Sequence, residues 1–140
     1  MKKLMFAVVV ILTGCGGNKI CSPAGIAEWE RGYIGYAEQT RADNAETVMA
    51  RGTADCKGYA VVSMQRLRAC GIEGRIVKLS PVDNKGPGHV VVTFRQPNGE
   101  RGYISGGRAG VTWELFPLET PWAEIIRSID GGKWEANFTE

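Results

Sequence analysis

The first fifteen residues limit most strongly what this chain can fold into. Lys2 and Lys3 give a basic start, residues 4–12 form an unbroken apolar run, and small residues then lead to Cys15. This layout is that of a secretory signal. The run has nine residues, whereas a membrane-spanning helix needs about 20. The run is therefore expected to direct export, and the folded domain must come from the residues that follow.

The end of this run, Leu12-Thr13-Gly14-Cys15, resembles the lipobox of bacterial lipoproteins, where the cysteine sulfur receives diacylglycerol before cleavage. The resemblance implies a signal peptide over residues 1–14 and a mature protein that begins at a lipid-bearing Cys15. Several acyl chains make such an anchor effectively permanent. Gly16 in place of aspartate implies, by similarity to enterobacterial sorting, the outer membrane, with the domain facing the periplasm. A buried N-terminal strand is the alternative, and the absence of alternation disfavours it.

Composition after cleavage narrows the class of partner. Removing Lys2 and Lys3 leaves 15 basic residues against 15 acidic ones, so the mature chain is neutral. Its basic residues form no run, which argues against a nucleic-acid partner. The mature length suits one domain. We therefore expect a tether over residues 15–23 and a single domain over residues 24–140.

The first half of that domain reads as helices. Apolar positions recur at three- and four-residue steps from Ala24 to Gln39, as on one face of a helix. Asp43 and Glu46 resemble a capping box that opens a short second helix, which Gly52 would end. A third helix is expected from Asp55 or Cys56 to Ala69, followed by Gly71 as its stop.

After Gly71 the pattern changes to that of strands. Strands are expected over residues 75–79, 89–95, 100–104 and 111–116, with a hairpin turn at Asn98-Gly99. A helix from Pro121 to about Ile129 and an edge strand over residues 133–138 complete the prediction. Helices first and a sheet later predict an α+β domain.

Cys56 and His89 are the residues that invite a catalytic interpretation. His89 is the only histidine and opens a strand, while Cys56 lies at the start of a helix. A helix N-terminus favours a thiolate, and a neighbouring histidine could hold that charge and later protonate a leaving group. The alternative is that both are ordinary structural residues. One histidine, no paired-cysteine spacing and no acidic loop of calcium-ligand spacing predict that the chain uses neither a metal nor another cofactor.

The short sequence motifs around Cys56 and His89 resemble those of the bacterial transglutaminase-like cysteine proteinases. They are Asp55-Cys56-Lys57-Gly58-Tyr59-Ala60 and Gly88-His89-Val90-Val91, followed by a hairpin, and the similarity covers about residues 43–107. It implies a papain-like fold in which the nucleophile helix packs on a small antiparallel sheet, with Cys56 as nucleophile and His89 as base.

The third catalytic position departs from that family. Ser105 stands where the family has an orienting aspartate. A serine hydroxyl can fix the histidine tautomer, but it is neutral and stabilises an imidazolium less than a carboxylate does. Asp55 or Asp83 could compensate.

Two functions follow from these patterns. The first is a membrane-anchored thiol hydrolase, a peptidase or amidase, that forms an acyl-enzyme on a protein or peptide of the cell envelope; acyl transfer shares its first half-reaction. The second is a catalytically silent relative that binds a partner through the old cleft.

Cys21 and Cys70 are the remaining thiols. Export would permit a disulfide. If Cys56 is the nucleophile it must stay unpaired, so only a Cys21–Cys70 disulfide is compatible with function. The other possibility, which we favour from the sequence, is that Cys70 is a buried free thiol at the end of its helix.

Overall fold

The computed structural model describes residues 21–41 and 43–136. The predicted signal peptide and Cys15 lie outside these residues. Within the described ranges no helix is both long enough and apolar enough to cross a membrane.

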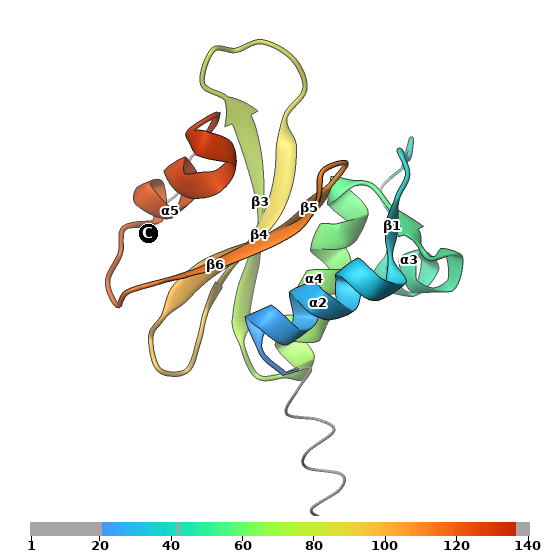
Figure 1. Cartoon of the computed structure of the whole chain (residues 1–140), viewed down its shortest axis with the longest axis horizontal. Helices are drawn as coiled ribbons and strands as arrows, with labels where there is room; N and C mark the ends of the chain where they lie inside the picture. The colour runs from blue at the N-terminus through green and yellow to red at the C-terminus, as the bar shows by residue number, and fades with distance from the viewer. Residues whose placement is uncertain (1–20, 42, 137–140) are drawn as a thin grey trace, which may run out of the picture.

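The domain places its helices mostly before its sheet (Figure 1). The helical half contains α2 (Pro23–Tyr33), β1 (Gly35–Tyr36), α3 (Ala45–Arg51), β2 (Thr53–Ala54) and α4 (Cys56–Ala69). The second half contains β3 (Glu73–Pro81), β4 (His89–Arg95), β5 (Arg101–Gly107), β6 (Gly110–Phe116), α5 (Trp122–Ser128), the short 3₁₀ helix η1 (Ile129–Gly131) and β7 (Trp134–Glu135). The predicted α+β class is confirmed.

The main sheet is antiparallel and has the strand order β6-β5-β4-β3-β7. The consecutive strands from β3 to β6 pair as hairpins, and the predicted turn at Asn98-Gly99 joins β4 to β5. Gly99 has a φ of 92°, which glycine adopts without steric cost. Short connections of this kind bring the start of β4 and the end of β5 to the same end of the sheet.

Two hydrophobic cores cover the two faces of this sheet. Alternate residues of a strand point to opposite faces: Val92 and Phe94 pack with α2 and α4, whereas Val91 packs with α5 and Trp134. Figure 1 shows α2 and α4 on one side of the sheet and α5 on the other. The helix that begins at Cys56 is therefore fixed along its length by a buried face that includes Val62 and Leu67.

The first helix is shorter than the sequence pattern predicts. Helix α2 ends at Tyr33, and Ile34 is extended, with a φ of −123°. The following residues form β1, which pairs in parallel with Thr53 and Ala54 of β2. The prediction of a helix as far as Gln39 is wrong after Tyr33. Pairing with β2 satisfies the backbone N–H and C=O groups that a helix would have satisfied, and local periodicity does not reveal such a pairing.

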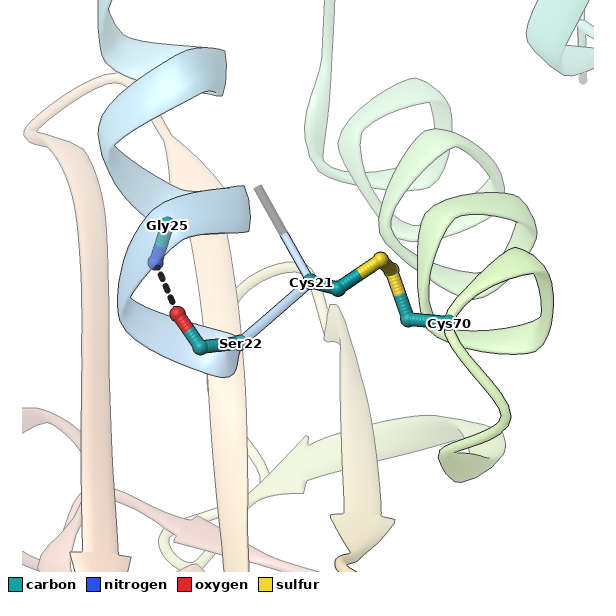
Figure 2. Close-up of a disulfide and its surroundings, with 4 residues drawn as sticks. All are labelled: Cys21, Ser22, Gly25 and Cys70. Carbon is teal, nitrogen blue, oxygen red and sulfur yellow. Dashed lines mark hydrogen bonds between the residues drawn. A yellow bond between two sulfur atoms is a disulfide. The ribbon is translucent and has the colours of Figure 1, made fainter. Parts of the chain in front are cut away.

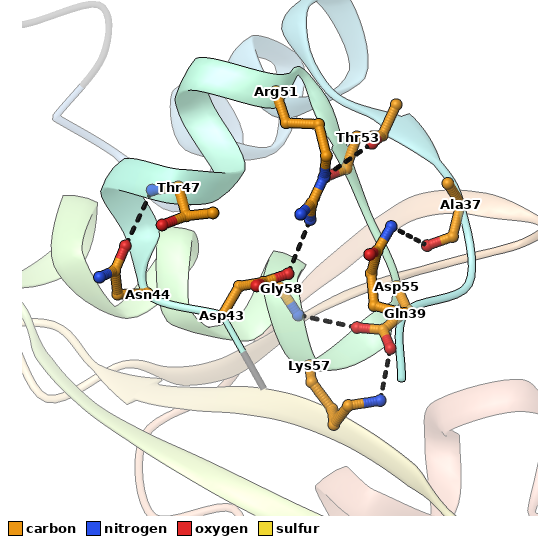
Figure 3. Close-up of polar contacts among 10 residues, drawn as sticks. All are labelled: Ala37, Gln39, Asp43, Asn44, Thr47, Arg51, Thr53, Asp55, Lys57 and Gly58. Atoms are coloured by element: carbon orange, nitrogen blue, oxygen red, sulfur yellow. Dashed lines mark hydrogen bonds and ion pairs between the residues drawn. The ribbon is translucent and has the colours of Figure 1, made fainter. Parts of the chain in front are cut away.

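The cap of α3 also differs. Asn44, not Asp43, is the N-cap, and its side chain accepts a hydrogen bond from the Thr47 N–H at 2.8 Å. Asp43 instead pairs with Arg51 at 2.7 Å (Figure 3). Gly52 ends the helix in the left-handed conformation, as predicted.

Cys21 and Cys70 form a disulfide, which corrects our preference for a free Cys70 thiol (Figure 2). Cys70 is the C-cap of α4, and Cys21 directly precedes Ser22, the N-cap of α2. Ser22 accepts a hydrogen bond from the Gly25 N–H at 2.9 Å. The packing of α2 against α4 brings the two sulfurs together, so residues 21–23 of the predicted tether already belong to the domain.

Candidate active site

Cys56 is the first residue of α4, and it is the one free cysteine among the described residues. Its side chain is partly exposed. The preceding residue, Asp55, is the N-cap and accepts a hydrogen bond from the Gly58 N–H at 3.1 Å. A cap of this kind fixes where the helix begins, so the thiol sits at the end where the backbone N–H groups point outward.

Asp55 serves this cap and not His89. Burial works against its ionisation, but hydrogen bonds from Lys57 and from the Gly58 backbone outweigh burial and hold the pKa of the Asp55 carboxyl below its usual value. Figure 3 shows the carboxylate between these two donors. Asp55 is thus a charged cap beside the thiol, and it does not supply the missing aspartate.

Tyr59 ties the first turn of α4 to the end of β5. A Cβ placed on Gly106 would come within 2.2 Å of the Tyr59 Cγ, so only glycine leaves room for the ring. The Tyr59 hydroxyl donates to the Ile34 carbonyl at 2.9 Å. Tyr59 of the Asp55–Ala60 motif therefore has a structural role, because it packs the turn that carries the thiol against the strand that carries Ser105.

His89 is the first residue of β4, opposite Leu79 of β3. A Cβ on the preceding Gly88 would lie 2.6 Å from the Leu79 carbonyl oxygen, which explains the glycine of the Gly-His word. A Cβ on Gly107 would stand 3.6 Å from the His89 Cε1. The imidazole thus lies beside the end of β5, next to the segment that Tyr59 packs against.

His89 and Ser105 are in direct contact. The His89 Nε2 and the Ser105 Oγ are 2.8 Å apart, and Ser105 is buried. The structure therefore brings together the histidine and the serine that the family pattern paired. The start of α4, the start of β4 and the end of β5 all lie at one end of the domain (Figure 1).

The charge state of His89 depends on three influences. Burial lowers the pKa of His89 below its ordinary value, the carboxylate of Asp130 opposes that shift, and Lys133 adds to it. The net direction is downward, so the imidazole is neutral at pH 7. A neutral imidazole can accept a thiol proton.

Sequence reasoning missed Asp130 and Trp134. The Trp134 ring stacks on the His89 ring with centroids 5.5 Å apart, and its indole N–H donates to the Asp130 carboxylate at 2.7 Å. Asp130 has a φ of 51°, an uncommon conformation for a residue other than glycine. The predicted edge strand over residues 133–138 is present as β7, with Trp134 in the core. The contact of Trp134 with His89 and the position of Asp130 were not predicted; the available signal was an aspartate next to two glycines.

Asp83 takes no part in this arrangement. It lies in the loop between β3 and β4, and its carboxylate accepts a hydrogen bond from the Lys85 N–H at 2.9 Å. The described residues contain no group of three or more His, Cys, Asp or Glu side chains that could hold a metal ion.

Comparison with known families places this geometry in context. A family model described as Transglutaminase-like superfamily matches residues 10–107, which include Cys56, His89 and Ser105. The matched segment is 98 of 140 residues. A comparison with curated proteins found no match.

Proposed function

Because this chain belongs to the transglutaminase-like superfamily, we propose that it is a membrane-anchored thiol hydrolase that cleaves amide bonds of a protein or peptide in the cell envelope. The observation that carries the proposal is the 2.8 Å contact between His89 and Ser105, at the same end of the domain as the free thiol of Cys56. Nucleophilic catalysis needs a thiol within reach of a histidine that a third group orients, and the proposal takes Cys56, His89 and Ser105 for these three roles.

In the proposed first step, His89 takes the thiol proton and the Cys56 sulfur attacks the amide carbonyl. The backbone N–H groups at the start of α4 hold the oxyanion. The C–N bond then breaks, His89 gives the proton to the leaving amine, and a thioester remains. Water, deprotonated by His89, attacks the thioester and releases the carboxylic acid and the free thiol. An amine in place of water would give acyl transfer.

In this proposal two residues replace the family's aspartate: Ser105 orients His89, and Asp130 supplies the negative charge. Ser105 accepts the His89 ring N–H and fixes the tautomer. Asp130 supplies negative charge at longer range, because it favours protonation of His89 and is held by the Trp134 indole. This arrangement supports turnover without a carboxylate in direct contact with the imidazole.

The disulfide supports an anchored arrangement. Cys21 lies six residues after Cys15, and it is bonded to the C-terminal end of α4. The 14 residues of α4 extend about 21 Å at 1.5 Å per residue. A lipid on Cys15 would thus be linked, through residues 16–20, to the end of α4 opposite to Cys56.

Two measurements test the hydrolase. Iodoacetamide should alkylate Cys56 in the purified protein at neutral pH, and Ser105→Ala should reduce the rate of this alkylation, because His89 then loses the group that orients it. Envelope peptides captured from cells with the wild-type chain should include cleavage products that are missing with Cys56→Ala. Identical products in both strains would refute the proposal.

A catalytically silent binding module is the second candidate, and the neutral Ser105 is the observation that favours it. In that case Ser105→Asp, which restores a carboxylate at the family's position, would leave cells without new cleavage products. For a hydrolase the same substitution should preserve or raise turnover.

A further inference from the structure

A hollow in the described part of the chain lies away from Cys56 and His89, neither of which lines it. It has a volume of about 830 Å³ and is bounded by the outward face of α4, the beginning of β3, the end of β4 and the beginning of β5. We call it the arginine groove, because Arg68, Arg75, Arg95 and Arg101 all line it. Glu73 is the only acidic residue among its lining side chains, so the groove carries a formal charge of +3.

The arginines of this groove are largely unpaired. Arg101 donates to the Thr120 carbonyl at 3.1 Å and lies over the Trp122 ring. The guanidinium groups of Arg68, Arg75 and Arg95 make no hydrogen bond or ion pair with any described residue. Arg95 also stands directly opposite Arg101 in the β4–β5 register, and like charges in that position repel. An anionic ligand would relieve this repulsion.

The groove also borders an open sheet edge. Within the described residues, β7 pairs only with Ser80 and Pro81 of β3. Residues 73–79 of β3 therefore present unpaired backbone groups on the side away from β4. An exposed edge of this kind is a template for one more strand.

We infer that the arginine groove binds an extended acidic peptide, which adds a strand to β3 and places its carboxylates on the face of the sheet that carries Arg75 and Arg95. The two observations together favour a peptide over an anionic lipid headgroup, because a headgroup has no backbone to pair with the open edge. On the α4 side of the sheet, Val61 and Met64 would contact the alternate, uncharged side chains. The groove would hold a substrate or partner at a distance from the thiol.

Fluorescence anisotropy tests the inference on the full chain carrying Cys56→Ser, in neutral detergent. The probe is a labelled eight-residue peptide that alternates valine and glutamate, and its counterpart has glutamine in place of glutamate. We expect the acidic peptide to bind about tenfold more tightly than the neutral one, since hydrogen bonds to charged groups are the stronger ones. Arg75→Gln with Arg95→Gln should abolish this difference, whereas Arg127→Gln, an exposed arginine of α5, should retain it.

N-methylation distinguishes strand addition from simple charge attraction. Methyl groups on one alternate set of peptide nitrogens should abolish binding, and those on the other set should not, because alternate N–H groups face the partner strand. Equal effects of both sets would overturn the inference. So would displacement of the peptide by added phosphatidylglycerol, or binding that appears only after residues 137–140 are removed.

The assay separates this inference from the proposed hydrolase. Binding is measured without the Cys56 thiol, so an inactive enzyme would still bind the acidic peptide. Failure to bind would leave the alkylation and cleavage results unaffected.

Discussion

The two ends of α4 carry cysteines with opposite chemistry. Cys56, at the N-terminal end, is a free and partly exposed thiol beside the charged cap Asp55. Cys70, at the C-terminal end, is bonded to Cys21 and holds α2 against the core. One rigid helix therefore keeps a potential nucleophile and a structural disulfide about 21 Å apart at 1.5 Å per residue. The separation shows how a domain can keep one thiol free while two others form a disulfide.

Removing the Cys56 thiol should have the largest effect on function. If Cys56 is the nucleophile, Cys56→Ala lowers the turnover of an envelope substrate by about 10³-fold or more. Stability should barely change, because the side chain is small and partly exposed. Thermal unfolding of both proteins is the control. Undiminished turnover in the variant would remove Cys56 from the mechanism.

Gly106→Ala should damage the Cys56 end of the helix through packing. The new Cβ would fall 2.2 Å from the Tyr59 Cγ, so the first turn of α4 must move away from β5. We expect a loss of about 4 kcal/mol in the free energy of unfolding, measured by urea denaturation. Gly71→Ala at the other end meets nothing within 4 Å, and only its positive φ is strained, so it should cost about 1 kcal/mol.

Loss of the disulfide should affect stability and leave the thiol reactivity of Cys56 intact. The bond closes a loop over a sequence separation of 49 residues. The double variant Cys21→Ala, Cys70→Ala should lose about 2–4 kcal/mol of unfolding free energy. Its Cys56 alkylation rate should match that of the wild type. A large change in that rate would mean that the two ends of α4 are not independent.

Glu30, which contacts the middle of α4, should make the free energy of unfolding depend on pH. It is buried in α2 and receives a hydrogen bond from Ser63 of α4, and one of its carboxylate oxygens has no partner. Burial raises the pKa of Glu30 to about 8. The folded state then holds a proton that the unfolded state loses above its ordinary pKa, so stability falls as pH rises from about 4.5 to about 8.

The expected slope is about 1 kcal/mol per pH unit in that window. Glu30→Gln cannot ionise and should flatten the dependence. Urea denaturation at pH 5 and pH 7.5 measures both proteins. A wild type that is equally stable at the two pH values would show that Glu30 finds a charge partner when it ionises.

Asp130 and Lys133 should shift the titration of His89 in opposite directions, and these are the smallest effects. Asp130→Asn keeps an acceptor for the Trp134 indole but removes the charge, so the pKa of His89 should fall further. Lys133→Gln removes a cation and should raise it. The chain has a single histidine, so one NMR titration curve reports it directly. Shifts of the same sign in both variants would contradict the electrostatic account.

Local patterns in the sequence determined much of the fold. The helix from Cys56 to Ala69 and the strand that opens at His89 were predicted from periodicity, capping residues and glycines, because these signals act over a few residues. The family resemblance likewise paired His89 with Ser105, and the two side chains are in contact. Their catalytic roles stay predictions.

Only the tertiary structure decided the contacts between distant segments. The sequence favoured a free Cys70, yet packing of α2 on α4 places Cys21 against it. Ile34 leaves the predicted helix because the next residues pair with β2. The carboxylate that raises the pKa of His89 belongs to Asp130, 41 positions further along the chain. A left-handed backbone conformation and the Trp134 indole hold Asp130 in place. Such contacts depend on where whole elements dock, and no local preference of the intervening residues encodes that position.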